Sequence, residues 1–208
     1  MHRFSQEEQR TIKENAVRRL DGYIVSLNSF GGELYDKLLR YKIYDFLPWE
    51  TEKPVMLDKW NEFVKNADPN ERYVFNCVLL QNPMCETMIR FGYDTETSFE
   101  YINNICDIIS PMEPFVVYLR SDNIKNAIEK TSAERGQDWL NGVIDYHCGG
   151  AYGKANGLAG FDGYIAALEE RQRRETEILR RLNVRSIIID EPQKDWDSTY
   201  AQIIRSLE

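Results

Sequence analysis

"YVFNCVLLQNP", residues 73–83, is the stretch on which the expected fold depends. Its apolar run is nearly continuous, too short to span a membrane, and bounded by polar residues. Such a run is typical of a strand buried on both faces, as in a parallel sheet covered by helices. We therefore predict a strand over residues 73–80. Gln81 and Asn82 follow it, and in open α/β sheets the carboxyl ends of strands are where ligands bind.

The rest of this half of the chain alternates between strand and helix patterns. Buried strands are predicted over 114–119 and 185–190, and helices over 95–110, 124–135 and 162–182. Strands that alternate with helices favour an α/β fold with a small parallel sheet. The sheet is thus predicted to contain 73–80 together with these two strands.

The same sequence patterns predict the domain organisation. We expect one domain over residues 1–208, with a mostly helical part over 1–70 and an α/β core over 71–208. Ser5 and Glu8 have the spacing of a capping box, which predicts a helix from Ser5 to about Leu20. The glycine-rich segment 141–163 is predicted to be a mobile, lid-like loop.

Composition argues against several classes of protein. The chain has 208 residues, 42% of them hydrophobic, and a formal charge of -8, which argues against non-specific binding to nucleic acids or membrane surfaces. Four cysteines without a CxxC pair and only two histidines predict no metal site. Reduced thiols and a charged amino terminus favour a cytoplasmic protein without a membrane span.

Arg171 and Glu175 are the most informative polar pair. They continue the apolar stripe of the helix over 162–182 and lie one turn apart, so they can pair with each other. An ion pair on an inward stripe is costly unless it is partnered or faces a wet cleft. Arg171 is therefore the best candidate on this helix for binding an anion. The alternative is a partly exposed structural pair.

Further candidates for a nucleotide or anion site follow the strands. Arg120 ends the strand over 114–119, and Lys130 and Arg135 lie on the next helix, where basic residues can reach phosphate oxygens. Gln81 and Asn82 complete the set. Asn82-Pro83 can equally be an ordinary strand-to-helix turn, and Arg135 can neutralise the carboxyl end of its helix. No catalytic residue is predicted, since no nucleophile-base arrangement is readable.

Several segments resemble P-loop kinases of the thymidylate- and nucleoside-kinase-like group. These are "VFNCVLLQNP", "PFVVYLRSDN" leading into "IKNAIEKTSAERG", "YGKANGLAGFDGYIAALEERQ" and "RSIIID". The resemblance covers roughly residue 55 to the carboxyl terminus and implies a P-loop NTPase-like fold. It places Lys130 and Arg135 around the lid and nucleotide. It also places Asn76 where many such kinases carry an acidic residue, and an amide cannot act as a general base.

The chain departs from this group at the phosphate loop. Such kinases carry a strand followed by G-x-x-x-x-G-K-[ST], and no such sequence is present. The resemblance therefore implies a shortened form, either a natural degenerate relative or part of a larger protein. We expect no catalytic activity from the chain as it stands, but either a residual anion or nucleotide cleft or a protein-interaction role. The alternative is an active nucleotide-dependent kinase or NTPase, using ATP and Mg²⁺ and completed by an unrecognised phosphate site or a partner chain.

The absence of the strand that precedes the phosphate loop in these kinases also affects which strands are expected to pair. In the kinases that this chain resembles, that strand lies between the counterparts of 73–80 and 114–119. We expect these two strands to pair directly, giving a three-stranded parallel core. The segment "GYIVSL" (22–27) is the internal alternative for filling the gap. A smaller sheet leaves apolar surface that a homodimer or a larger assembly can cover.

Overall fold

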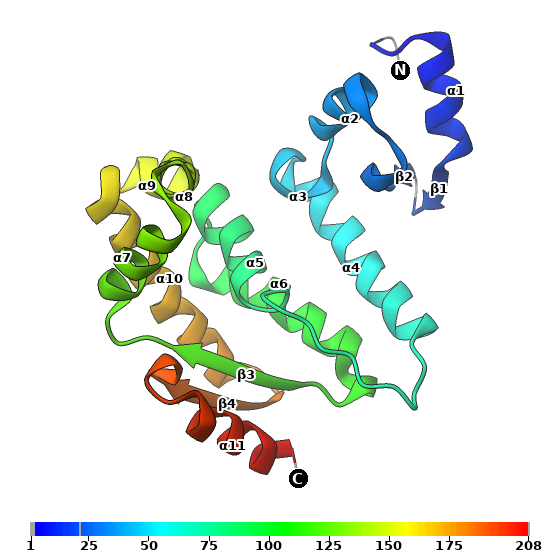
Figure 1. Cartoon of the computed structure of the whole chain (residues 1–208). Helices are drawn as coiled ribbons and strands as arrows, with labels where there is room; N and C mark the ends of the chain where they lie inside the picture. The colour runs from blue at the N-terminus through cyan, green and yellow to red at the C-terminus, as the bar shows by residue number, and fades with distance from the viewer. Residues whose placement is uncertain (1–2, 21, 208) are drawn as a thin grey trace. The chain divides into compact units, whose positions relative to one another are not determined.

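The computed structural model describes residues 3–20 and 22–207, and the chain divides into two units, Met1–Asn66 and Ala67–Glu208 (Figure 1). Most of the described residues are helical, and two short sheets complete the structure.

The first unit is a helical region with one hairpin. It contains α1 (Gln6–Glu14), β1 (Ala16–Arg19), β2 (Gly22–Val25), α2 (Gly32–Leu39), α3 (Ile43–Phe46) and α4 (Trp49–Asn66). The capping box predicted at Ser5 and Glu8 is present. The prediction that this helix continues to Leu20 is wrong, because residues 16–19 form a strand. They pair antiparallel with β2, so "GYIVSL" completes this hairpin rather than the parallel sheet.

The second unit contains the parallel sheet. Its elements are α5 (Gln81–Met84), a π-helical segment (Cys85–Arg90), α6 (Thr95–Ile109), β3 (Phe115–Arg120), α7 (Ile124–Arg135), α8 (Gln137–Gly149), α9 (Ala151–Ala155), α10 (Gly160–Arg181), β4 (Arg185–Asp190) and α11 (Trp196–Leu207). β3 pairs in parallel with β4, with Phe115 opposite Arg185 and Arg120 opposite Asp190. The expectation of parallel strands flanked by helices is confirmed in this coarse form.

The strand predicted over 73–80 is wrong. Residues 72–75 are irregular, and the chain then turns into α5. The apolar run is divided between two environments, since Val74 is 96% exposed whereas Leu80 is buried in the core. Cys77 has a φ of 67°, in the left-handed region, which interrupts an extended chain. The backbone amide of Asn82 closes the turn on the carbonyl of Cys77 at 2.9 Å.

The predicted three-stranded core fails for the same reason. Direct pairing of 73–80 with 114–119 is absent, and within the described ranges β3 has β4 as its only strand neighbour. An apolar run forms a strand only where another strand satisfies its backbone groups. In the part of the chain that the structure describes, no strand pairs with residues 73–80.

The lid-like loop predicted over 141–163 is also wrong. These residues form most of α8, all of α9 and the start of α10. Gly149 and Gly150 mark the junction between α8 and α9 rather than a mobile loop. A Cβ atom on Gly150 would lie only 2.2 Å from the carbonyl oxygen of Ile89, so this glycine permits close packing on the π-helical segment.

Three other helix predictions are confirmed, those over 95–110, 124–135 and 162–182. Local caps explain two of their starts. Asp94 accepts a hydrogen bond from the amide of Thr97 at 2.8 Å before α6, and Asn123 accepts one from the amide of Asn126 before α7.

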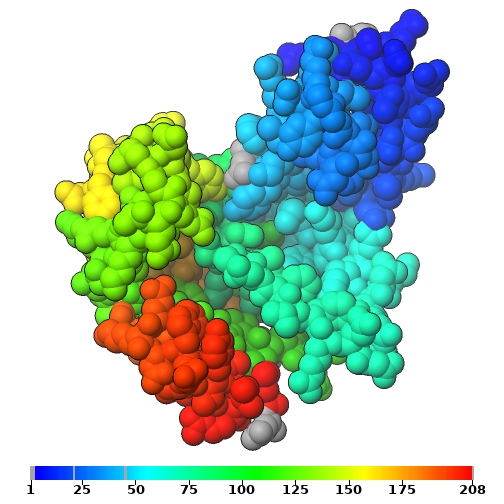
Figure 2. All heavy atoms as spheres, in the orientation of Figure 1, coloured from blue at the N-terminus to red at the C-terminus, as the bar shows by residue number. Residues whose placement is uncertain are grey.

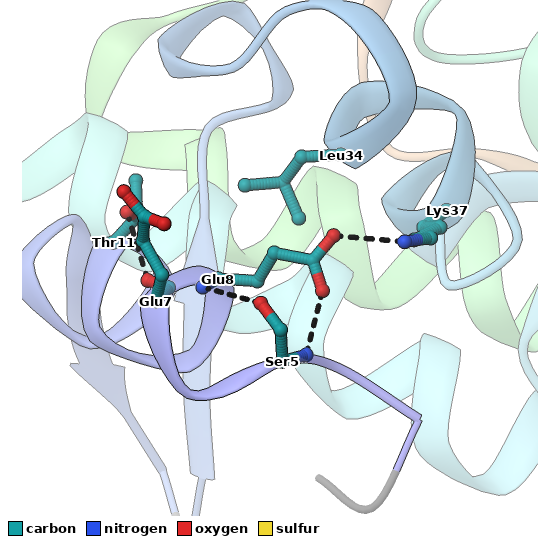
Figure 3. Close-up of a pocket in the computed structure, with 6 residues that line it drawn as sticks. All are labelled: Ser5, Glu7, Glu8, Thr11, Leu34 and Lys37. Carbon is teal, nitrogen blue, oxygen red and sulfur yellow. Dashed lines mark hydrogen bonds and ion pairs between the residues drawn. The ribbon is translucent and has the colours of Figure 1, made fainter.

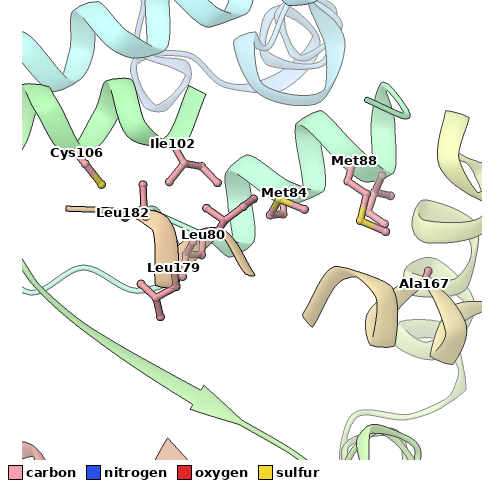
Figure 4. Packing of buried hydrophobic residues seen from close by; sticks show 10 residues of the cluster. Leu80, Met84, Met88, Ile102, Cys106, Ala167, Leu179 and Leu182 are labelled. Carbon is pink, nitrogen blue, oxygen red and sulfur yellow. The ribbon is translucent and has the colours of Figure 1, made fainter. Parts of the chain in front are cut away.

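The core of the second unit lies where α5, the π-helical segment, α6 and α10 meet (Figure 4). Its buried members are Leu80, Met84, Met88, Ile89, Ile102, Cys106, Ala167, Ile178, Leu179 and Leu182. Val116 and Tyr118 of β3 and Ile188 of β4 pack against this cluster. One face of the small sheet therefore packs against the core.

α11 is a surface helix that buries one narrow side. Thr199 is 3% exposed, whereas Trp196, Tyr200 and Ile204 are exposed at helical spacing on another side. The atoms of this carboxyl-terminal segment lie at the surface in Figure 2. The exposed apolar stripe of α11 is therefore defined by Trp196, Tyr200, Ile204 and Leu207.

Candidate functional site

Gln81 and Asn82 no longer stand at the end of a strand. They begin α5, where Gln81 is exposed and Asn82 is half-buried. The side-chain oxygen of Gln81 accepts a hydrogen bond from the Cys77 thiol at 3.3 Å. The geometric reason for expecting these amides in a ligand cleft is thus absent.

Arg120 does end a strand, but a carboxylate neutralises it. Its Nε and Nη2 donate to Asp190 at 2.5 and 2.9 Å, and the two residues are opposite each other in the β3–β4 register. The Asp190 carboxylate raises the pKa of Arg120 above its ordinary value. Arg120 therefore joins the carboxyl end of β3 to that of β4 through its contact with Asp190.

Lys130 and Arg135 are exposed on α7. The guanidinium of Arg135 lies 5.4 Å from the centroid of the Trp139 ring, a distance at which a cation–π interaction contributes. Arg135 is also in the last turn of α7, where a cation favours the helix dipole. The side-chain hydrogen bonds and ion pairs of Gln81, Arg120 and Arg171 go to residues that were not predicted for the site.

Arg171 and Glu175 point inward, as their spacing predicted. Their side chains are 16% and 5% exposed, and Arg171 Nε lies 3.1 Å from Glu175 Oε1. These two atoms form an ion pair without the geometry of a hydrogen bond. Arg171 Nη1 also donates to the Cys85 sulfur at 3.4 Å, and the Tyr118 hydroxyl donates to Glu175 Oε2 at 2.6 Å.

These four residues, Arg171, Glu175, Tyr118 and Cys85, form what we call the interior polar cluster. It joins α10 to β3 and to the π-helical segment. Burial raises the pKa of Glu175, while Arg171 and the Tyr118 hydroxyl act in the opposite direction. Burial also raises the pKa of Tyr118 and of the Cys85 thiol, so both groups favour their neutral forms.

His147 lies beside this cluster. Burial lowers its pKa to about 4, with a smaller effect from Arg171, so the imidazole is neutral near pH 7. Since Nδ1 lies 2.7 Å from the Val143 carbonyl, Nδ1 carries the proton and donates it there. Nε2 is buried and has no hydrogen-bond partner among the described residues. The ring centroid of Tyr164 is 4.8 Å away.

Sequence reasoning missed Tyr118, Cys85 and His147. Tyr118 could have been found, because it is the polar-tipped residue on the core-facing side of its strand and a buried hydroxyl needs a partner. Cys85 and His147 give no such signal. They lie on other segments, and only the packing of these segments against α10 brings them to Arg171.

The exposed side of α10 carries an ion-pair network. Arg174 pairs with Glu170 at 2.7 Å, and Arg173 pairs with both Glu170 and Glu177. Hydrogen bonding from Arg173 lowers the pKa of Glu170 to about 2. These charges stabilise one another and leave no excess cation for a ligand.

The first unit has an open groove between α1 and α2 (Figure 3). It is lined by Ser5, Glu7, Glu8, Thr11, Leu34 and Lys37. Lys37 lies 2.9 Å from both Glu8 and Glu33, and Glu8 also caps the amide of Ser5. The polar groups of this groove thus hold the two helices together.

Two further findings limit the chemistry. Within residues 3–20 and 22–207, no group of three or more histidine, cysteine or acidic side chains could hold a metal ion. None of the helices in those ranges combines the length and apolar composition needed to cross a bilayer.

Comparison with known proteins adds no relative. No protein-family model matches the chain, and no curated protein or solved structure is significantly similar to it. The functional argument therefore rests on the geometry of the chain itself.

Proposed function

We propose that this chain is a P-loop-kinase-like protein without a phosphate loop that performs no phosphoryl transfer itself and acts by binding another protein at the open edge of β3. The observation that carries the proposal is that, among the described residues, β4 is the one strand that pairs with β3. Every strand needs partners for its backbone groups, and one side of β3 offers those groups to a partner strand.

The geometry of the β3–β4 ladder shows which groups these are. The Arg120 carbonyl accepts a hydrogen bond from the Glu191 amide at 2.8 Å, so the backbone of Arg120 faces β4. Backbone direction alternates along a parallel strand. The amides and carbonyls of Phe115, Val117 and Leu119 therefore face away from β4. We call this side of β3 the open edge.

The charges support an interaction role over a residual anion cleft. Arg171 is neutralised by Glu175 and Arg120 by Asp190, and both acids lie within hydrogen-bond or ion-pair distance. An anion at either arginine would displace a carboxylate. At Arg171 it would also have to enter the protein interior, where desolvation opposes it.

The first expected result concerns nucleotide binding. ATP with Mg²⁺ should bind with a dissociation constant weaker than about 10 μM, equivalent to roughly -7 kcal/mol, because no phosphate loop supplies amides to the phosphates. Isothermal titration calorimetry checks this, with Mg²⁺ alone as the control. Binding at or below that constant would instead favour a kinase completed by an unrecognised phosphate site.

The second expected result concerns the open edge. Leu119→Pro removes an amide that faces away from β4, and proline is tolerated at such an edge position. Leu119→Ala removes the side chain but keeps the amide. Extended peptides selected from a display library should bind the wild-type chain and the alanine variant, and bind the proline variant at least about tenfold more weakly, since strand addition depends on backbone hydrogen bonds.

Circular dichroism and thermal unfolding of both variants provide the folding control. If the selected peptides bind the proline and alanine variants equally, or if no peptide is selected, the open edge is not the binding surface.

A further inference from the structure

A histidine is buried on α8, the helix that contacts α9, α10 and the π-helical segment. The side chain of His147 belongs to a residue that is 6% exposed, and its ring contacts the rings of Tyr146 and Tyr164, with centroids 5.1 and 4.8 Å away. Three residues further along the chain, Gly150 packs closely on the backbone of Ile89 in the π-helical segment. His147 therefore lies at the junction that holds α8 and α9 to the rest of the second unit.

The hydrogen bonding of this ring suits its neutral form. Nδ1 donates to the Val143 carbonyl, one helical turn earlier. Nε2 is buried, and no hydrogen-bonding group of the described residues reaches it. In the neutral ring Nε2 is an acceptor, whereas protonation turns it into an N–H donor that carries part of a positive charge. A buried donor without an acceptor is costly, and a buried charge without an anion costs more.

The charged groups around the ring do not supply that anion. The buried and half-buried titratable side chains of the packed elements are Cys85, Glu86, Tyr152, Tyr164, Arg171 and Glu175. Among the described residues, Arg171 is the one charged group found to act on the imidazole, and it is a cation.

The acids of this region are engaged with other groups. Glu175 pairs with Arg171 and accepts a hydrogen bond from Tyr118, and Glu86 pairs with Arg90 at 2.6 Å. Asp145 on α8 and Lys154 on α9 are exposed. A protonated imidazole would therefore be buried beside a like charge.

We propose that His147 is an acid-sensitive contact, which holds α8 and α9 on α10 and the π-helical segment while its ring is neutral and releases them when the ring takes up a proton. This device is independent of the open edge, which lies on β3. Release would admit water to the side of α10 that carries Arg171.

The proton equilibrium of the ring sets the pH range. Burial lowers the pKa of His147 to about 4, from an ordinary value of 6.5. The closed state thus binds fewer protons than the released state, so the contact is fully formed above pH 6.5 and weakens as the pH falls toward 4. Glu175 acts in the opposite direction, because burial raises its pKa and protonation lessens the cost of burying it. At about pH 5 the contact should be about twentyfold weaker than at about pH 7.

Amide hydrogen exchange of the full chain at these two pH values tests the proposal. Rates are converted to protection factors, which removes the intrinsic effect of pH on exchange. In the wild-type chain, the protection of α8 and α9 should fall about twentyfold on acidification, whereas that of α6 should change less than about threefold. His147→Leu cannot be protonated, so its α8 and α9 should lose less than about threefold.

Two further measurements cover the case in which the leucine variant does not fold. His147→Gln is the second variant, since its amide can donate to the Val143 carbonyl but does not titrate. The chain has only one other histidine, His2, so a nuclear magnetic resonance titration of His2→Gln reports the imidazole of His147 alone. Its pKa should lie well below 6.5.

Four outcomes overturn the proposal. The first is an imidazole pKa near the ordinary value, and the second is wild-type protection of α8 and α9 that is the same at both pH values. The third is an equal loss in the leucine or glutamine variant, which would assign the effect to other groups. The fourth is an equal loss in α6, which would show that acid weakens the whole unit and releases no particular helix.

Discussion

Replacing Gly150 with alanine should destabilise the second unit by about 3 kcal/mol, at the upper end of the usual cost of overpacking. The new methyl group would stand 2.2 Å from the carbonyl oxygen of Ile89 and 2.9 Å from its carbonyl carbon. Both are backbone atoms, so no side chain can rotate away. The backbone of Gly150, with φ of -69° and ψ of 172°, is open to any residue, so the effect would be steric alone.

Gly149→Ala is the matched control, because a Cβ atom at Gly149 meets nothing within 4 Å. Alanine in this last residue of α8 should be neutral or slightly stabilising. Urea unfolding followed by circular dichroism compares the two variants. Equal stability of the two would mean that α9 does not pack closely on the π-helical segment.

Replacing Arg171 with alanine should cost about 3 kcal/mol of unfolding free energy, since it leaves the Glu175 carboxylate buried without its cation. Arg173→Ala is the exposed control on the same helix, and its loss should be less than about 1 kcal/mol. Urea unfolding at neutral pH checks both. A neutral effect of Arg171→Ala would show that the interior polar cluster does not stabilise the fold.

The pH dependence distinguishes a buried charge from lost packing. Burial holds the pKa of Glu175 above its ordinary value, and removing Arg171 takes away an interaction that lowers it. A raised carboxyl pKa favours folding at low pH and disfavours it as pH rises through that pKa. The loss of unfolding free energy caused by Arg171→Ala should therefore be smaller at mildly acidic pH than at neutral pH.

A second substitution tests the effect of the buried Glu175 charge directly. Adding Glu175→Gln to Arg171→Ala should restore part of the stability at neutral pH, because the amide keeps an acceptor for Tyr118 without the buried charge. If the stability lost in Arg171→Ala depends neither on pH nor on the addition of Glu175→Gln, the loss comes from packing and not from the buried charge.

Three apolar runs in this sequence look alike, and two of them form strands. The runs predicted over 114–119 and 185–190 satisfy each other's backbone groups. Among the described residues no strand pairs with 73–80, and this run divides between solvent and core. Local pattern measures how apolar a segment is, but a strand also depends on a distant neighbour. The helices over 95–110 and 124–135 were easier to predict, because their caps are local.

In the candidate site, too, some features follow from the local sequence and others depend on distant segments. The inward position of Arg171 and Glu175 follows from helical periodicity, which is a local property. Cys85 and His147 meet them only through packing of other segments. The glycine-rich sequence around Gly150 predicts a loop, since glycine is common in loops, but in the structure Gly150 allows two backbones to approach closely.

The parallel pairing of β3 with β4 has a consequence for how the second unit folds. Partners such as Arg120 and Asp190 are 70 residues apart in the chain, and closing so long a loop is entropically costly before other contacts form. The helices between the strands, α7 to α10, shorten that loop once they have formed and packed. We therefore expect the sheet to be a late event in folding, so that its open edge is created only after the helices that flank it are already in place.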